Sequence, residues 1–383
     1  MSMSNLETVS IGHLGLPASL GAFHPRRLAL VTDAWKPQTN GVVNTLVRLE
    51  KSLESKGTEV LVVAPDGHRT FPCPSYPEIR VAWDPWKAVP RIRAFEPDAI
   101  HVATEGPLGF WTVGWLRRQG LRFTTSFHTR YAEYLSARAP VPLEWGYQLV
   151  RWFHERAAHT LVSSQSLLDE LAERNVGRRL VHWPRGVDAT FFHPRHRDGG
   201  VYTDLPGPLW LYVGRVAVEK SLEDFLDLPL PGTKVIVGDG PSREALQRKY
   251  PDVVWRGYRF GDDLGAHFAS ADCFVFPSRT ETFGNVLLEA MASGLPVASV
   301  PAPGPVDLVE EGVNGAIDDQ LMRACLRALR CSRERTRASI VGRTLKAGHD
   351  VFRAHLVPAN PAAGERFAPI SETDAPRGAL AAL

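Results

Sequence analysis

Short apolar runs rich in β-branched residues recur along the chain, and segments with a helical period lie between many of them. Gly41–Lys56 and Asn285–Ser293 are two such helical segments. Strands that alternate with helices predict a parallel sheet covered by helices on both faces. The pattern runs through twice, so we expect two α/β domains. The expected strands are Leu28–Thr32, Val60–Ala64, Ala99–Val102, Phe123–Ser126, Thr160–Val162, Leu180–Trp183, Leu209–Val213, Lys234–Val237, Val253–Trp255, Cys273–Phe276 and Val297–Val300.

The two sets of strands are separated by a polar stretch rich in Gly and Pro, His193–Pro208. Such composition is typical of a linker, and 383 residues are enough for two domains. We therefore expect a first domain over 1–198 and a second over 199–337. After Ala316 the strand pattern stops, and 338–356 is expected to form a helix that packs back on the first domain. Residues 357–383 are expected to form a loose tail.

Composition narrows the class of protein. The hydrophobic fraction of 44% and the charged fraction of 22% are typical of a globular protein, and the net charge of +2 argues against a nucleic-acid partner. No apolar run of about 18 residues predicts a transmembrane helix. The first 23 residues lack the pattern of a signal peptide, so we expect a cytoplasmic location. The four cysteines, Cys73, Cys273, Cys325 and Cys331, lack the spacing of a disulfide framework or zinc site.

The strongest candidate for chemistry follows the strand that ends at Phe276. Glu281 precedes a predicted helix, Gly284 lies at its start and Glu289 lies inside it. A helix start binds phosphate through unpaired N–H groups and the helix dipole, and carboxylates accept hydrogen bonds from hydroxyls. The motif therefore suits a polyol beside a phosphate. The alternative is a solvated Glu and an ordinary helical Glu.

A second candidate is cationic. Gly214 and Arg215 end another predicted strand, and Lys220 follows five residues after Arg215. The carboxyl ends of parallel strands are where open α/β sheets bind ligands, and an Arg–Lys pair there would neutralise a diphosphate. No Asp-x-Asp sequence occurs, which argues against a metal held by such a pair. The alternative is two ordinary surface cations.

Two weaker candidates lie in the first half of the chain. Asn40-Gly41 follows the strand that ends at Thr32, and this pair tolerates the positive φ of a tight turn that brings backbone close to a ligand. His128 follows the strand that ends at Ser126, where an imidazole can meet a ligand. Each has a structural alternative, a simple turn and a structural histidine.

Together these segments resemble the retaining glycosyltransferases of family GT4, which have the GT-B architecture of two facing Rossmann-like domains. The resemblance covers roughly 27–356. It rests on Glu281 with Glu289, on Gly214-Arg215 with Lys220, and on Pro184-Arg-Gly-Val-Asp188-x-x-Phe191. Gly294-Leu-Pro-Val and Glu311-Gly-Val-Asn-Gly315 extend it. The fold expected is thus α/β of the GT-B type, with parallel sheets and a C-terminal crossover helix.

The resemblance also implies roles for single residues. Arg215 and Lys220 would bind the donor diphosphate, together with the amides of Phe283 and Gly284. Glu281 would hold hydroxyls of the donor sugar, Glu289 the ribose, and His128 would face the sugar. Asn40 and Gly41 correspond to the loop that approaches the phosphate. Many relatives have Gly-Gly at Asn40-Gly41, and Gly at Thr282.

The chemistry implied is front-face transfer with retention, in which the departing diphosphate is neutralised by Arg215, Lys220 and the helix start. The catalytic residues expected are therefore His128, Glu281, Arg215 and Lys220. No enzyme nucleophile, metal or other cofactor is expected, and the nucleotide sugar is a co-substrate. A UDP-sugar is favoured as donor over GDP-mannose. Other interpretations are a GT-B-like epimerase or phosphorylase and a non-catalytic binding module.

The acceptor is suggested by aromatic and basic residues that interleave between Trp83 and Phe153. Such a mixture suits a bilayer surface with anionic lipid, and Thr32-Asp-Ala-Trp and Phe127-His-Thr-Arg-Tyr resemble the subgroup that glycosylates diacylglycerol or related lipids. We expect a peripheral enzyme on the inner face of the membrane that moves a hexose or uronic acid onto a lipid. The rival function is that of a cytosolic transferase acting on a soluble sugar or glycan precursor. The rival explanation of the aromatic residues is that most of them belong to the core. The rings are Trp83, Trp86, Phe110, Trp111, Trp115, Tyr131, Tyr134, Trp145, Tyr147, Trp152 and Phe153, and the cations are Lys87, Arg91, Arg93, Arg117, Arg118, Arg122 and Arg138.

Overall fold

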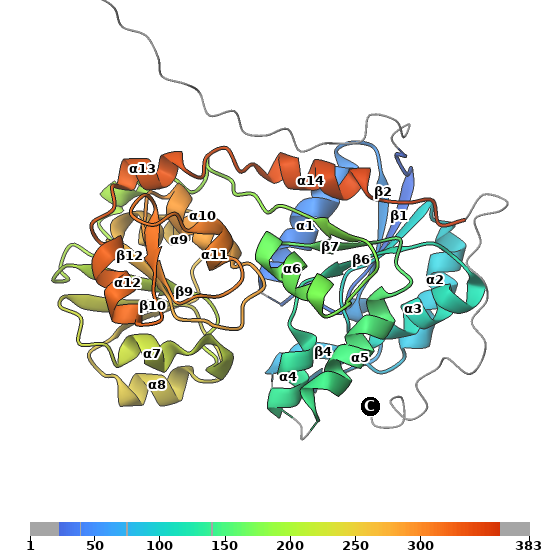
Figure 1. The fold of residues 1–383 in the computed structure, drawn as a ribbon, viewed down its shortest axis with the longest axis horizontal. Coiled ribbons are helices and arrows are strands. Elements are labelled where there is room, and N and C mark those ends of the chain that lie inside the picture. Colours follow the sequence, from blue (N-terminus) through green and yellow to red (C-terminus); the bar gives the residue numbers. More distant parts are fainter. Residues whose placement is uncertain (1–22, 39, 74–75, 139–140, 361–383) are drawn as a thin grey trace, which may run out of the picture.

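The computed structural model describes residues 23–38, 40–73, 76–138 and 141–360. Its two α/β domains lie side by side, the first at the right of Figure 1 and the second at the left. Each is built on a six-stranded parallel sheet. The GT-B expectation of two parallel-sheet domains is confirmed.

The first sheet has the order β2-β1-β5-β6-β7-β8. Leu28 and Leu30 of β1 pack in one buried cluster, and Ala29 and Val31 pack in another, because successive side chains of a strand point to opposite faces. The first cluster includes residues of α1, and the second includes residues of α2, α3 and α5. The elements are β1 (Arg27–Val31), α1 (Gly41–Glu54), β2 (Glu59–Val63), η1 (Pro65–Gly67), β3 (Thr70–Cys73), β4 (Tyr76–Ala82), η2 (Pro85–Lys87), α2 (Ala88–Phe95), β5 (Ala99–Val102), α3 (Pro107–Gln119), β6 (Thr124–Phe127), α4 (Tyr131–Arg138), α5 (Leu143–His154), β7 (His159–Val162), α6 (Gln165–Glu173) and β8 (Leu180–His182).

The second sheet has the order β11-β10-β9-β12-β13-β14. Leu209 and Leu211 of β9 face the cluster that holds α9 and α10, while Trp210 and Tyr212 face the cluster that holds α7, α8 and α12. Helix α7 has only five residues, in keeping with the short connection there. The elements are η3 (Pro194–Gly199), β9 (Leu209–Val213), η4 (Val218–Lys220), α7 (Leu222–Leu226), β10 (Thr233–Val237), α8 (Arg243–Lys249), β11 (Val254–Gly257), α9 (Gly261–Ser270), β12 (Cys273–Phe276), α10 (Asn285–Ala292), β13 (Val297–Ser299), α11 (Pro305–Leu308), β14 (Gly315–Ile317), α12 (Leu321–Ala328) and α13 (Arg333–Ala338).

The chain crosses between the domains earlier than its Gly- and Pro-rich stretch. Phe192 and Tyr202 are buried in the core of the second domain, so most of the expected linker packs there. The crossing lies at 183–187, where the amide of Val187 donates to the carbonyl of Arg343 at 3.0 Å. A Cβ on Gly186 would lie 2.2 Å from the backbone of Thr344, so the two crossing segments approach too closely for a side chain.

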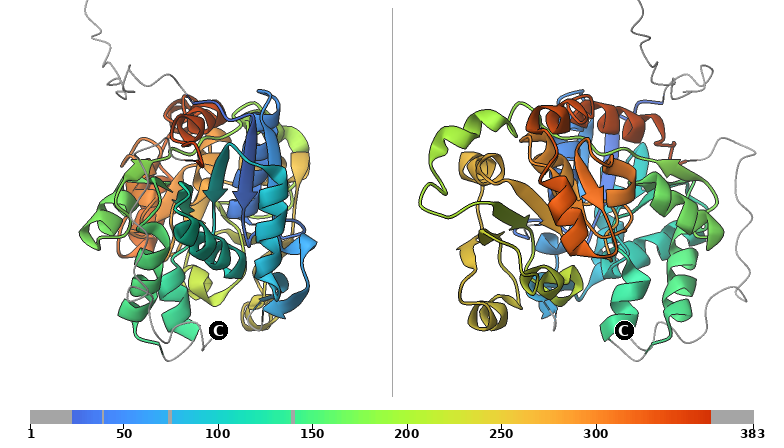
Figure 2. Two further views of the ribbon diagram at one scale, coloured as in Figure 1. Left: turned by 90° about the vertical axis from the view of Figure 1, so that its right-hand side faces the viewer. Right: turned by 60° about the vertical axis from the view of Figure 1, so that its left-hand side comes forward.

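The return crossing ends in α14 (Leu345–Ala354), which is shorter than the helix expected over 338–356. Thr344 caps it by accepting from the amide of Ala347, so the helix cannot continue from α13. Phe352 packs in the core beside β1, which confirms a crossover helix on the first domain. Helices α13 and α14 follow one edge of the molecule, over the second and first domain respectively (Figures 1 and 2).

The segment expected as a loose tail begins with packed residues. Ala359 is buried, its amide donates to Asp98 at 2.7 Å, and its carbonyl accepts from Arg122 at 2.9 Å. Residues 361–383 of that expected tail lie outside the described residues. So do residues 1–22, which make up most of the N-terminal segment without a signal-peptide pattern. Within the described chain no helix is both long and apolar enough to cross a membrane.

Candidate active site between the two domains

The candidate residues follow the carboxyl ends of strands at or next to the point where the strand order of each sheet reverses, between β1 and β5 in the first sheet and between β9 and β12 in the second. In the second domain β9 and β12 are neighbours, and their carboxyl ends carry Arg215 and the loop to Glu281. In the first domain β1 leads to Asn40 and β6 leads to His128. Such reversal points are the general ligand sites of open α/β sheets.

Lys220 and Glu281 form the central ion pair. Lys220 Nζ donates to Glu281 Oε2 at 2.7 Å, and both side chains are mostly buried. Burial alone would lower the pKa of Lys220, but the Glu281 carboxylate raises it, so the ammonium stays charged. The hydroxyl of Thr280 donates to the carbonyl of Glu219 at 3.1 Å, which holds the two loops together. A fixed cation therefore lies beside a carboxylate that can accept from hydroxyls.

Arg215 belongs to the same neighbourhood. Its carbonyl accepts from the buried hydroxyl of Tyr212 at 2.8 Å. The pKa of Tyr212 is raised first by burial, and Lys220 and Arg215 oppose this effect while Glu281 adds to it. Arg215 thus stands at the carboxyl end of β9, five residues before Lys220.

The start of α10 is shaped to leave backbone amides available. Gly284 precedes the helix with φ +80°, a conformation that costs residues with a Cβ free energy. Neither the amide of Phe283 nor that of Gly284 donates a hydrogen bond within the described residues. A Cβ on Gly304 would lie 1.9 Å from the carbonyl oxygen of Phe283, so this loop also needs glycine behind it.

The loop before α10 touches the first domain directly. Thr282 Oγ1 donates to the carbonyl of His128 at 3.0 Å, and the hydroxyls of Ser163 and Ser164 donate to the carbonyl of Thr282 at 3.2 Å. Arg130 donates to the carbonyl of Glu281 at 3.3 Å. These bonds bring His128 beside the residues of the second domain.

Arg130 was not singled out from sequence, although it follows His128 by two residues. Its guanidinium donates to Glu133 at 2.8 Å and to Glu170 at 2.6 Å, and the residue is buried. Two carboxylates therefore hold it in place while it contacts the Glu281 loop. This role depends on Glu170 and Glu281, which are 40 and 151 residues away, so no spacing rule could have revealed it.

Asn40 and Gly41 have a different local role from the turn predicted. Asn40 has φ −151° and caps α1, its side-chain oxygen accepting from the amides of Val42 and Val43 at 3.0 Å. Gly41 does not adopt positive φ. The expected positive-φ turn is wrong because Asn40 satisfies the first amides of the helix instead. Asn285 of α10 donates to Thr45 at 3.2 Å, so the start of α1 still faces the start of α10.

Glu289 lies about one turn into α10 and is half-buried. Burial raises its pKa to about 7, and the charge of Arg48 on α1 works against this effect. Its carboxyl group thus titrates near neutral pH. Glu289 lies inside α10, seven residues after Thr282, which contacts His128.

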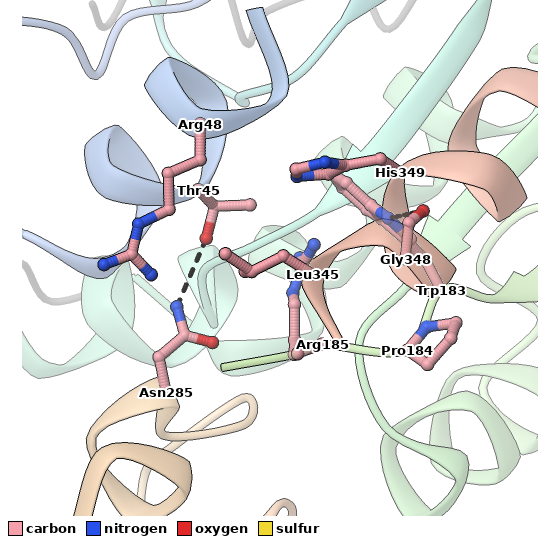
Figure 3. A pocket seen from close by; sticks show the side chains of 10 residues that line it. Thr45, Arg48, Trp183, Pro184, Arg185, Asn285, Leu345, Gly348 and His349 are labelled. Atoms are coloured by element: carbon pink, nitrogen blue, oxygen red, sulfur yellow. Dashed lines mark hydrogen bonds between the residues drawn. The ribbon is translucent and has the colours of Figure 1, made fainter. Parts of the chain in front are cut away.

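His128 itself is buried and bonded to Arg185, a residue of the segment where the chain crosses. Arg185 Nη2 lies 3.2 Å from His128 Nδ1. Burial and then Arg185 lower the pKa of His128 well below its ordinary value, so the imidazole is neutral. Figure 3 shows Arg185 in a pocket with Thr45 and Arg48 of α1, Asn285 of α10 and His349 of α14. The sequence showed Arg185 only as part of the Pro-Arg-Gly-Val-Asp motif.

Comparison with known proteins identifies the family to which the chain belongs. The sequence pattern described as Glycosyltransferase Family 4 matches residues 39–191, and that described as Glycosyl transferases group 1 matches residues 207–331. The GDP-mannose-dependent alpha-mannosyltransferase of Mycolicibacterium smegmatis is 35% identical over 76% of this chain and 84% of its own length. The chain belongs to glycosyltransferase family 4. It is a glycosyltransferase, as the resemblance implied.

Other similar proteins carry different names. Sulfoquinovosyl transferase SQD2 of Arabidopsis thaliana is 32% identical over 76% of this chain and 62% of its own. Alpha-monoglucosyldiacylglycerol synthase of Acholeplasma laidlawii is 23% identical over 76% of this chain and 84% of its own. The solved sucrose-phosphate synthase of Thermosynechococcus elongatus superposes with a TM-score of 0.65 at 20% identity, over 86% of this chain and 95% of that one. That likeness supports the GT-B fold.

Proposed function

We propose that this family 4 glycosyltransferase moves a hexose or uronic acid from a nucleotide sugar to a membrane lipid such as diacylglycerol, with retention of anomeric configuration. The observation that carries the donor site is the Lys220–Glu281 pair beside the start of α10. The cation, the carboxylate and the available amides lie on the two loops that follow β9 and β12. This set suits a diphosphate joined to a sugar.

In the proposed reaction the diphosphate binds Arg215, Lys220 and the amides of Phe283 and Gly284. Negative charge grows on its leaving oxygen as the bond to the sugar breaks, and these donors stabilise that charge. Glu281 accepts from sugar hydroxyls and Glu289 from the ribose. The acceptor hydroxyl arrives on the face from which the diphosphate departs, and its proton passes to the departing phosphate. We propose that no metal takes part, and that a UDP-sugar is preferred to GDP-mannose.

The lipid acceptor is supported by the surface of the first domain. The aromatic residues between Trp83 and Phe153 divide: Tyr147 and Phe153 are core, whereas Trp83, Trp86 and Trp111 are 67%, 49% and 43% exposed. The rings of Trp86 and Trp111 lie 6.1 Å apart. Trp83 contacts Phe71, itself 39% exposed, at 5.9 Å. We call these side chains, three indoles and the phenyl ring of Phe71, the indole patch, and they are apolar area left in contact with water.

Cations accompany the indole patch. Lys87 adjoins Trp86 in η2, and Arg93 on α2 and Arg118 on α3 are also exposed. Helices α2 and α3 both pack against η2, so these charges belong to one neighbourhood. Exposed indoles with Lys and Arg suit the headgroup layer of an anionic bilayer. The proposed enzyme is peripheral, on the inner face of the membrane. The diacylglycerol acceptor is supported by the name of the Acholeplasma laidlawii relative.

Flotation tests the acceptor proposal. Vesicles of anionic phospholipid with diacylglycerol are expected to carry the protein upward at low salt and to release it at high salt, because salt screens surface charge. Replacing Trp83, Trp86 and Trp111 together by Ser is expected to abolish flotation. Leu326→Ser, at an equally exposed apolar position on α12, is the matched control. Protein that stays in solution with every vesicle, and transfers sugar to a soluble acceptor instead, would refute the lipid proposal.

A further inference from the structure

Arg185 is a buried cation with a donor to spare. Only 8% of the residue is exposed, and its guanidinium lies 3.8 Å from the centre of the Trp183 ring. Nη2 donates to Nδ1 of His128 at 3.2 Å, whereas Nη1 is buried without a hydrogen-bond partner among the described residues. Burial lowers the pKa of Arg185 to about 9, so the side chain is charged at neutral pH. Buried polar groups are nearly always bonded, so the N–H groups of Nη1 point to a ligand that accepts.

Two more side chains bring donors to the pocket that Arg185 lines. Figure 3 shows Arg48 of α1 on one side of this pocket and His349 of α14 on the other. Neither forms a hydrogen bond or an ion pair with another residue that the structure describes. Burial, and then the charges of Lys56, Arg185 and Arg48, lower the pKa of His349 to about 4, against the opposing charge of Asp350. The imidazole is therefore neutral and has one N–H to donate.

The pocket is lined by cations and by no acid. Asp350 acts on His349 from outside the lining, and its carboxylate is already bonded to two lysines at 2.6 and 2.8 Å. Arg48 lowers the pKa of Asp188 and Glu289, but neither acid lines the pocket. A buried cation costs free energy unless an anion compensates it. The other lining residues are Thr45, Trp183, Pro184, Gly186, Asn285, Leu345 and Gly348.

The size of the pocket restricts the anion. Its volume is about 30 Å³. One water molecule needs ~10–15 Å³ by the same measure, so the pocket has room for one small ion but not for a sugar or a nucleotide. Arg48, Asn285 and Leu345 are partly exposed, so the pocket is open to solvent.

We infer that this pocket binds a phosphate ion through Arg185, Arg48 and His349. Two guanidinium groups match the charge of a phosphate dianion, and Arg forms strong charge-assisted hydrogen bonds to phosphate oxygens. The three donors come from the crossing segment, from α1 and from α14, so they surround the ion as a tetrahedral group of acceptors requires. Asn285 of the second domain completes the wall, so the ion lies between the two domains where the chain crosses.

Two sources could supply phosphate to this pocket, namely free phosphate in solution and the diphosphate of the nucleotide sugar. In the proposed reaction the diphosphate has other partners, which are Arg215, Lys220 and the start of α10. The inference is therefore a second anion site that free phosphate fills. Free phosphate in such a site binds together with the nucleotide, whereas a nucleotide whose diphosphate occupied the pocket would displace it.

Calorimetric titration of the whole protein with inorganic phosphate tests the inference. Phosphate is expected to bind without nucleotide, and with the same affinity when UDP or GDP, whichever binds more tightly, is saturating. Arg185→Met is expected to weaken phosphate at least ~10-fold, the effect of one lost hydrogen bond to a charged group. Arg323→Met, at an exposed position on α12, is the matched control and is expected to bind phosphate as wild type does. Acetate, which is planar and carries one charge, is expected to bind more weakly than phosphate.

Several results would overturn the inference. One is a wild-type protein that does not bind phosphate, a result that needs no variant. Another is displacement of phosphate by the nucleotide, which would assign the ion to the donor site. Should Arg185→Met not fold, Arg48→Met is expected to weaken phosphate ~3-fold, a smaller effect because solvent screens this partly exposed charge. Unchanged phosphate affinity in either variant contradicts the inference. Failure of the proposed function is distinct, because phosphate is titrated without donor or acceptor.

Discussion

Lys220 Nζ and Glu281 Oε2 lie 2.7 Å apart across 61 residues of sequence. The two residues come from the loops after β9 and β12, which are neighbours in the sheet although β10, β11 and the helices α7, α8 and α9 lie between them in the chain. The strand order thus assembles the pair. It places a cation where negative charge develops in the proposed reaction.

Removing that cation should slow transfer. Lys220→Met is expected to lower kcat/KM by ~10²-fold or more, equivalent to ~2.7 kcal/mol of lost transition-state stabilisation. Lys249→Met is the matched control, because Lys249 forms an exposed ion pair with Glu223. Steady-state kinetics with the preferred donor measure both. Equal activity of the two variants would exclude Lys220 from the transition state.

The two glutamates of the motif should separate sugar binding from nucleotide binding. Glu281→Ala is expected to weaken the intact donor while free nucleotide binds nearly as in wild type. Glu289→Ala is expected to weaken free nucleotide as well, since the ribose loses its acceptor. Titration of each variant with nucleotide and with donor decides. Equal losses of nucleotide affinity in the two variants would contradict the division.

Glu289 should make stability depend on pH. Its folded pKa of about 7 lies above the ordinary 4.5, so between these values the folded protein holds more protons than the unfolded one. Stability therefore falls as pH rises through this window. Glu289→Gln removes the buried charge. The difference in melting temperature between this variant and wild type is therefore expected to favour the variant more at pH 8 than at pH 5. Glu173→Gln, at an exposed site, should show the same difference at both pH values. A pH-independent effect of Glu289→Gln would contradict the raised pKa.

Donor turnover should need no divalent metal. In the proposed site Arg215 and Lys220 neutralise the diphosphate, which is the task a metal would otherwise perform. We expect turnover in excess EDTA to match that with magnesium or manganese. Loss of activity in EDTA and its recovery on adding either ion would show that the two cations are not sufficient.

The sequence predicted most strands because each is a short run rich in apolar and β-branched residues, and β1, β5 and β12 are almost wholly buried. It missed β14, which has only three residues, and the β3–β4 hairpin, an antiparallel pair outside the main sheets. It placed the linker by composition, whereas Phe192 and Tyr202 bury that stretch in the second core. Such burial depends on packing between distant residues, which a local pattern does not report.

The same distinction holds for the site. Lys220, Glu281 and Gly284 stand in recognisable motifs at strand ends, so their neighbourhood could be predicted from the sequence. The bond between His128 and Arg185 joins residues 57 apart that meet only because β6 and the crossing segment are adjacent in space. The exposure of Trp83 and the burial of Phe153 likewise follow from the fold, since both are aromatic residues in one stretch of chain.

The anomeric configuration of the lipid product tests the account most directly. Purified protein is incubated with vesicles containing diacylglycerol and an α-linked nucleotide sugar, the donor with the tighter binding being chosen. The glycolipid is then isolated and its anomeric proton coupling is measured by nuclear magnetic resonance. The account predicts an α-glycosyl diacylglycerol. A β-linked lipid, or free sugar and nucleotide with no lipid product, would contradict it.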